Sequence, residues 1–251
     1  MRLTDLTEFI RAHDLEEGSG GRRPPRDNIR AVQNALSAGL ADDEFYHDCI
    51  ELELDAIQRR RNGDLLAVLH RIPERQMNIR MYYWPVGKLS RPHEHTKWTV
   101  TAVFFNALQV TTYDWDVARS ERRLLQKNVF RAEQGQAGHI YDRCIHNPAN
   151  VSDRPAASIH IFNDSDMPLL EQEVGPIEGM GNPKVSRAPT DPVARTQWVE
   201  WVSQGKMRML ALALARFRTP RAEALLNVIS GYADAATLEK VNRIQRRIKY
   251  S

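Results

Sequence analysis

The chain has 251 residues, and its 35 lysines and arginines nearly balance 32 aspartates and glutamates, for a formal net charge of +3. This balance gives no reason to expect nucleic acid as the principal partner, although residues 243–249 are locally basic. The 2 cysteines are too few for a disulfide framework. No apolar run reaches the roughly 18 residues that a membrane span needs, so we expect a soluble, cytoplasmic protein.

Residues 1–64 are predicted to form an N-terminal helical region. Apolar spacing predicts a short helix over 3–10 and longer helices over 29–40 and 44–60. Residues 17–28, rich in Gly, Pro and Arg, predict a loop between the first two. Asn62-Gly63-Asp64 then predicts a turn.

Residues 65–174 are predicted to form a β-rich domain, because the pattern changes there to short β-type runs. Turn signals rich in Gly or Pro separate most of these runs. Many short strands at this spacing predict an antiparallel sandwich or barrel. The expected strands cover residues 65–71, 77–84, 99–106, 108–115, 128–132, 140–145 and 157–163.

Residues 175–251 are predicted to form a Gly/Pro-rich connector, to 189, and a C-terminal helical region. Asp191-Pro192 supplies an N-cap followed by proline at the first helical position. A long amphipathic helix is expected from there to about Thr219-Pro220, and a second helical pattern covers 222–248. These helices are candidates for a homodimer contact or for a cover over the barrel mouth.

His93 and His95 stand just before the apolar run 98–105. At the entry to a strand, side chains two positions apart share one face, so both imidazoles would point the same way. Two neutral imidazoles at the mouth of a sheet supply two-thirds of a facial metal site. The same alternation turns Glu94 to the opposite face, which makes it a poor ligand candidate.

Three later histidines compete for the third ligand position: His139, His146 and His160. A third histidine would give an all-neutral donor set, which keeps the full charge of a divalent metal and leaves coordination positions open. Such a site suits an anionic, soft donor such as a thiolate, together with dioxygen. Cys144 shares strand parity with His146, but a small buried residue is the preferred interpretation.

Two segments resemble the cysteine dioxygenase family of thiol dioxygenases, which belongs to the cupin superfamily. Residues 92–98, Pro-His-Glu-His-Thr-Lys-Trp, are similar to that family's His-x-His-Thr segment. Residues 145–150, Ile-His-Asn-Pro-Ala-Asn, followed by 157–162, Ala-Ser-Ile-His-Ile-Phe, are similar to its second region. The resemblance spans about residues 65–163. It implies a cupin-like antiparallel β-barrel, or jelly roll, flanked by N- and C-terminal helices.

The resemblance also implies a site and an activity. His93, His95 and His146 would hold Fe(II), and Ser158 and His160 would form a hydrogen-bonded relay beside it. The implied partners are a small-molecule thiol and dioxygen, and the implied product is a sulfinate.

The chain departs from the family pattern at the places that would contact substrate. Phe162 replaces the tyrosine of the relay and so removes a hydroxyl. Arg71 and Arg80 are candidates for the arginine that grips a substrate carboxylate, although each is also compatible with a surface or structural role. Tyr82 and Trp98 are candidates for either pocket lining or core packing.

Two other functions therefore stay open from the sequence alone. The same iron site could oxidise a non-thiol molecule in a specialised pathway, as the unplaced carboxylate clamp and the helical additions suggest. Alternatively, the barrel could be a non-catalytic metal- or ligand-binding cupin that acts as a sensor or scaffold, which the Phe162 substitution and the basic C-terminal helix favour.

Overall fold

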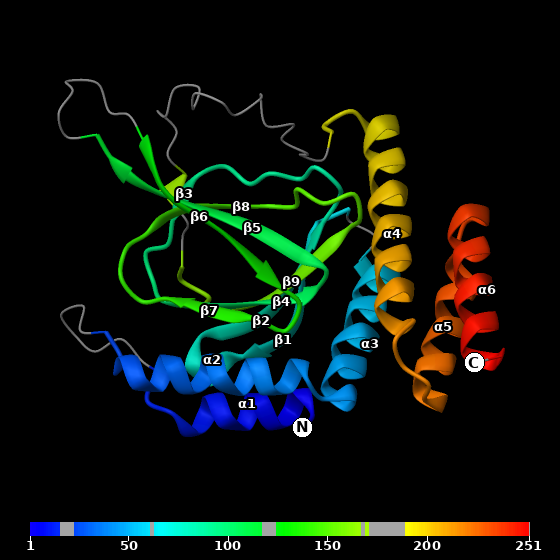
Figure 1. Ribbon diagram of the computed structural model, residues 1–251, viewed down its shortest axis with the longest axis horizontal. Coiled ribbons are helices and arrows are strands. Elements are labelled where there is room, and N and C mark those ends of the chain that lie inside the picture. The colour runs from blue at the N-terminus through cyan, green and yellow to red at the C-terminus, as the bar shows by residue number, and fades with distance from the viewer. Residues whose placement is uncertain (16–22, 61–62, 117–123, 167–168, 171–188, 251) are drawn as a thin grey trace.

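A computed structural model describes residues 1–15, 23–60, 63–116, 124–166, 169–170 and 189–250 (Figure 1). Three helices precede the strands: α1 (Leu3–Ala12), α2 (Arg26–Leu40) and α3 (Asp43–Arg60). Three helices follow them: α4 (Pro192–Leu214), α5 (Pro220–Tyr232) and α6 (Ala235–Tyr250). The strands between are β1 (Leu66–Ile72), β2 (Met77–Trp84), β3 (His93–Glu94), β4 (Thr99–Phe105), β5 (Ala107–Trp115), β6 (Leu124–Glu133), β7 (Ala137–Ile140), β8 (Ile145–Ala149), β9 (Ala156–Asn163) and β10 (Leu169–Leu170), with a 3₁₀ turn, η1 (Pro73–Arg75), after β1.

The strands form two five-stranded antiparallel sheets that face each other (Figure 1). The first sheet has the order β1-β2-β9-β4-β7, and the second has the order β10-β3-β8-β5-β6. Two antiparallel sheets with these crossovers are the architecture of jelly-roll folds such as cupins. The predicted cupin-like antiparallel barrel with flanking helices is confirmed.

Side-chain alternation divides the first sheet into an apolar outer face and a polar inner face. On β9, the outward-facing Ala157, Ile159 and Ile161 belong to the large buried core that the sheet shares with the helices. Ser158 and His160 alternate with them and therefore face the second sheet. Strands β2 and β4 pair with β9 on either side, and residues that are paired directly point to the same face of the sheet. The side chains of β2 and β4 that are paired with β9 therefore divide between the outer and the inner face as those of β9 do. The barrel interior is therefore the place where polar chemistry is concentrated.

The N-terminal helices cover the outer face of the first sheet. In Figure 1, α1 and α2 lie below the barrel, and α3 lies beside it. The helices are joined to the sheet by buried polar contacts as well as apolar packing, for example from the Tyr46 hydroxyl on α3 to the Phe104 carbonyl at 2.6 Å. This packing fixes the sheet that carries half of the barrel interior.

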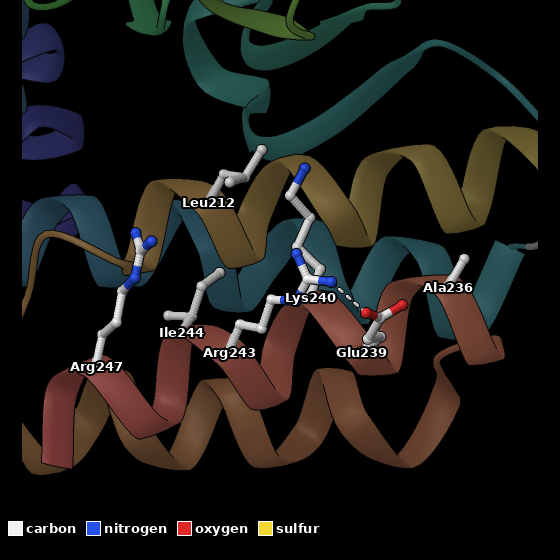
Figure 2. Close-up of a pocket in the computed structure, with 7 residues that line it drawn as sticks. All are labelled: Leu212, Ala236, Glu239, Lys240, Arg243, Ile244 and Arg247. Carbon is white, nitrogen blue, oxygen red and sulfur yellow. Dashed lines mark hydrogen bonds and ion pairs between the residues drawn. The ribbon is translucent and has the colours of Figure 1, made fainter. Parts of the chain in front are cut away.

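The C-terminal helices stand beside α3, on the opposite side of the barrel from β3 (Figure 1). The predicted cap of α4 is confirmed, since the Asp191 carboxylate accepts a hydrogen bond from the Ala194 N–H at 2.8 Å. A buried ion pair between Lys206 and Glu53, at 2.8 Å, joins α4 to α3. A hollow of about 290 Å³ lies between α4 and α6. Figure 2 shows the residues that line it, among them the apolar Leu212 and Ile244 and the basic Lys240, Arg243 and Arg247.

Several expected boundaries differ from the structure. The strand expected over 140–145 is wrong, because β7 ends at Ile140 and β8 begins at Ile145. Asp142, in the gap, binds Arg23 and Arg26 of the N-terminal region, and this tie holds the segment as a bend. The helix expected over 222–248 is two helices, since the backbone is extended at Ala233 and Asp234 caps the start of α6 through the Thr237 N–H at 2.7 Å.

Two further expectations concern less regular segments. The loop expected to run to residue 28 ends earlier, because α2 already begins at Arg26. The expected connector 175–189 lies, apart from its last residue, outside the described residues. Within the described part of the chain, no helix combines the length and the apolar character that crossing a membrane requires.

Candidate metal centre

His93, His95 and His146 converge in the structure. One ring nitrogen from each lies within 4.8 Å of the others. The sheet register explains the meeting, because His93 on β3 is paired directly with His146 on β8. His95 directly follows β3, two positions after His93, and faces the same way, with its ring 5.1 Å from that of His93. Of the three candidates for the third position, the structure therefore selects His146.

The Nδ1 atom of each histidine is already committed to an acceptor. His93 Nδ1 lies 2.8 Å from the Arg91 carbonyl oxygen, and His146 Nδ1 lies 3.1 Å from the Cys144 carbonyl oxygen. His95 Nδ1 lies 2.6 Å from a carboxylate oxygen of Asp166. Because none of these partners has a hydrogen to donate, each Nδ1 carries the proton and each Nε2 keeps its lone pair. Three converging Nε2 lone pairs fit a divalent first-row metal.

Asp166 connects the histidine cluster to the loop that follows β3. One of its oxygens binds His95, and the other accepts hydrogen bonds from the Thr96 N–H at 3.0 Å, the Thr96 hydroxyl at 2.9 Å and the Lys97 N–H at 3.2 Å. Burial opposes ionisation, but the hydrogen bonds from His95 and Thr96 outweigh it and lower the pKa of Asp166. A carboxylate behind a ligating imidazole fixes its tautomer and raises its basicity.

Burial favours the neutral, metal-binding form of two of the three histidines. Burial lowers the pKa of His93, and burial together with the neighbouring His93 lowers the pKa of His146 to about 3. Glu94 is not part of the cluster, because it turns away and lies 3.6 Å from Arg143. Among the described residues, the donor set is therefore three imidazoles with no carboxylate.

A second polar group lies deeper in the barrel, on the facing sheet. The Trp84 indole N–H donates to the Ser158 hydroxyl at 2.8 Å, Ser158 is hydrogen-bonded to His160 Nε2 at 2.7 Å, and His160 Nδ1 is bonded to the Thr101 hydroxyl at 3.0 Å. Burial, and then the neighbouring histidines, lower the pKa of His160 to about 3. Both nitrogens of this neutral ring thus have protein partners.

Phe162 lies between this chain of hydrogen bonds and the histidine cluster. Its ring is stacked against His160 at 5.2 Å and against His95 at 5.4 Å between centroids. Arg80 lies over the same ring at 5.5 Å, and its Nε donates to the Asn78 side chain. Phe162 therefore contacts both His95 and His160, and Arg80 lies against its ring.

The other candidate residues lie in different surroundings. Arg71 is exposed and pairs with Asp164 at 3.5 Å, which is a surface role. Tyr82 faces the barrel interior, with its ring 6.4 Å from His160. Trp98 packs in the core between the first sheet and the helices, so the core interpretation holds for it rather than pocket lining. His139 is on β7 and contacts Gln33 of α2.

Sequence reasoning missed Asp166, Trp84 and Thr101. Thr101 had a usable signal, because alternation from Thr99 turns it to the same face as its partner His160. Asp166 had only a weak signal, a polar Asn-Asp-Ser-Asp stretch that begins with the last residue of β9. Its contact with His95 depends on how the chain returns beside β3, which no local pattern encodes.

Comparison with known proteins finds only distant structural similarity. No protein-family model matches the chain, and no curated protein shows significant similarity. Among solved structures, an oxalate oxidase in complex with glycolate matches with 15% identity over 44% of this chain and 56% of that one, with a TM-score of 0.34. A cupin 2 conserved barrel domain protein from Rhodopseudomonas palustris matches with 14% identity over 42% and 64%, with a TM-score of 0.35. The DMSP lyase DddQ from Ruegeria pomeroyi DSS-3 matches with 14% identity over 40% and 45%, with a TM-score of 0.31.

These alignments span between 45% and 64% of the three proteins compared. The case for a function therefore depends on the geometry of the site.

Proposed function

We propose that this protein is a mononuclear non-haem Fe(II) enzyme of the thiol dioxygenase type, which oxidises a small thiol to a sulfinate with dioxygen. The observation that carries the proposal is the all-imidazole cluster of His93, His95 and His146, with each Nδ1 occupied by a protein acceptor. When bound there, Fe(II) would favour the thiolate form of the substrate and supply the redox chemistry with dioxygen.

The chain's own residues orient and enclose the reactants. Asp166 holds His95 in one tautomer, and the backbone carbonyls of Arg91 and Cys144 do the same for the other two histidines. Phe162 supplies an apolar wall beside His95. That wall keeps water from one side of the site, where a family relay would present a tyrosine hydroxyl.

Arg80 is the better of the two candidates for binding a substrate carboxylate. It is half-buried, on the inner face of β2 and over Phe162, whereas Arg71 is mostly exposed. Asn78 binds the guanidinium Nε, which orients the group, and the terminal Nη2 lies 3.9 Å from an Asp164 carboxylate oxygen. A planar guanidinium held in this way suits bidentate carboxylate binding.

Oxygen consumption by anaerobically Fe(II)-loaded protein tests the proposal. The substrates are cysteine, 3-mercaptopropionate and cysteamine, with a thiol-free control, and His146→Ala is the inactive variant. We expect thiol-dependent uptake with sulfinate as product, lost in the variant. Oxygen uptake without sulfinate would favour a non-thiol oxygenase, the alternative that the unplaced carboxylate clamp and the helical additions suggest. No uptake by iron-loaded protein with any thiol would favour the sensor or scaffold function.

A further inference from the structure

The row of paired residues that contains His93 and His146 continues across the second sheet. His146 on β8 is paired directly with Thr112 on β5, and Thr112 is paired in turn with Asn128 on β6. The Asn128 side-chain amide donates a hydrogen bond to the Thr112 hydroxyl at 3.4 Å. Directly paired residues point to the same face of a sheet, and neighbouring strands lie about 4.8 Å apart. Thr112 is therefore one strand away from a histidine of the cluster, and on the same face.

This face is turned toward the first sheet and the barrel interior. The ring of His95 is stacked against Phe162 of β9 on the first sheet, at 5.4 Å between centroids. Leu108 shares the face with Thr112, because the two are four positions apart on β5. Leu108 also belongs to one buried cluster with Trp84 of β2. Thr112 lies between these two points of contact and faces inward as they do.

A bulge in β6 reverses the alternation of its side chains. Thr112 is paired with Asn128, whereas the next residue of β5, Tyr113, is paired with Gln126. The register therefore skips Lys127. Bulges of this kind re-aim side chains and are frequent beside active sites. Residues of β6 on the two sides of Lys127 reach the same face of the sheet with opposite parity.

The bulge brings Leu125 and Phe130 to the inner face, although five positions separate them. Phe130 is paired with Val110, two positions from Thr112 along β5, and Leu125 is paired with Asp114, two positions from Thr112 in the other direction. The residue before Leu125 belongs to a buried cluster on the opposite face, as this alternation requires. Two large apolar side chains thus flank the row that leads to the histidines.

Both apolar side chains are accessible from solvent. Leu125 is 46% exposed and Phe130 is 50% exposed, so the inner face is open at β6. Two strand spacings, or about 10 Å, separate their strand from that of His146. A ligand bound at the histidines could cover this distance with a short chain. Exposed apolar groups beside a polar centre are typical of ligand-binding surfaces.

We propose that Leu125 and Phe130 form an apolar subsite beside the metal centre, and that the thiol substrate carries an aryl or alkyl group which extends across Thr112 onto these side chains. This inference rests on the proposed function and narrows its substrate to thiols with an apolar substituent. The subsite is distinct from the carboxylate contact proposed for Arg80, which lies on the other sheet.

Ligand pairs that differ only by a phenyl group test the subsite without requiring turnover. The pairs are butane-1-thiol with 4-phenylbutane-1-thiol and, as thiol-free probes, butyrate with 4-phenylbutyrate. Anaerobic binding to Co(II)-loaded protein is followed by visible absorption for wild type, Phe130→Ser, Leu125→Ser and Val129→Ser. Val129 is the matched control, because it is next to Phe130 and 48% exposed, and alternation turns it to the outer face.

We expect wild type to bind the phenyl member of a pair about tenfold more tightly than its partner. Phe130→Ser and Leu125→Ser should each reduce this preference about threefold or more, and Val129→Ser should retain it. Circular dichroism and cobalt content confirm that each variant is folded and loaded. The same preference in Phe130→Ser as in Val129→Ser would overturn the proposal, as would equal binding within both pairs by wild type.

Two further outcomes separate the subsite from other functions of this face. If sedimentation shows that Phe130→Ser changes the oligomeric state while the preference is unchanged, a second copy of the chain covers the face and the proposal is overturned. A preference between the carboxylates that depends on Phe130, without oxidation of any thiol, would refute the proposed dioxygenase function and leave the apolar subsite standing.

Discussion

Asp166→Asn is the substitution that tests the tautomer assignment most sharply. The carboxylate uses one oxygen for His95 Nδ1 and the other for the N–H groups of Thr96 and Lys97. An amide has a single acceptor oxygen. If that oxygen stays with the loop N–H groups, the amide NH₂ faces His95 Nδ1, which must then become an acceptor. The hydrogen of His95 would move to Nε2, the atom assigned to the metal.

The expected loss follows from this reversal. Removing a group that orients a metal-ligating histidine costs about 10–100-fold in metal affinity, or about 1.4–2.7 kcal/mol. Asp166→Ala frees the ring without imposing the wrong tautomer. We therefore expect alanine to reduce metal affinity less than asparagine does. Alanine should reduce the free energy of unfolding more, because the N–H groups of Thr96 and Lys97 lose their acceptor.

Anaerobic titration with Co(II), followed by visible absorption and chelator competition, measures the affinities of wild type and both variants. Urea unfolding of the metal-free proteins measures stability. Asp153→Asn, at an exposed position in the turn before β9, is the matched control and should bind Co(II) like wild type. Wild-type affinity in Asp166→Asn, or a larger affinity loss in alanine than in asparagine, would refute the tautomer reasoning.

Three further predictions concern acid stability, a buried ion pair and the aromatic wall. The pKa of His160 is about 3 in the folded protein and about 6.5 in the unfolded chain. Between these two pH values the imidazole binds a proton in the unfolded state and not in the folded state. The free energy of unfolding should therefore fall by about 2 kcal/mol from pH 7 to pH 5 through this residue. His160→Gln should lessen the fall by that amount in denaturant titrations at the two pH values, and equal falls would contradict the assignment. Lys206→Met leaves the buried Glu53 unpaired and should lower the free energy of unfolding by about 3–5 kcal/mol. A second change in the same protein, Glu53→Leu, should recover most of this loss. A Lys206→Met variant as stable as wild type would disprove the role of the pair. Phe162→Tyr adds a hydroxyl to a ring that is stacked against His160 and His95 and should raise the sulfinate formed per oxygen consumed, whereas an unchanged ratio would show that the position does not affect coupling.

The elements that the sequence predicted well are those with strong periodicity. Met77–Trp84 and Ala156–Asn163 alternate regularly, and their strands follow the pattern to within one residue. The two-residue strand at His93 was not separable from the run that begins at Thr99, although these belong to different sheets. Strand membership there depends on pairing with β8, which is remote in sequence.

The candidate site shows the same division between local and long-range information. The spacing of His93 and His95 indicated a shared direction, and the family resemblance implied His146 as the third ligand. The structure brings the three together, because His93 pairs directly with His146. Asp166 could not be found in this way. Its importance comes from partners gained in three dimensions, His95, Thr96 and Lys97, which residue type and spacing do not encode.

X-ray absorption at the iron edge, on anaerobic Fe(II)-loaded protein before and after addition of 3-mercaptopropionate, tests the central claim most directly. We expect a first shell with imidazole scattering from three histidines and no sulfur, and then one sulfur neighbour after the thiol is added. The same experiment on His146→Ala should show the loss of one imidazole or of the iron itself. Iron without imidazole neighbours in wild type, or no sulfur at saturating thiol, would contradict the proposed thiol-binding metal centre.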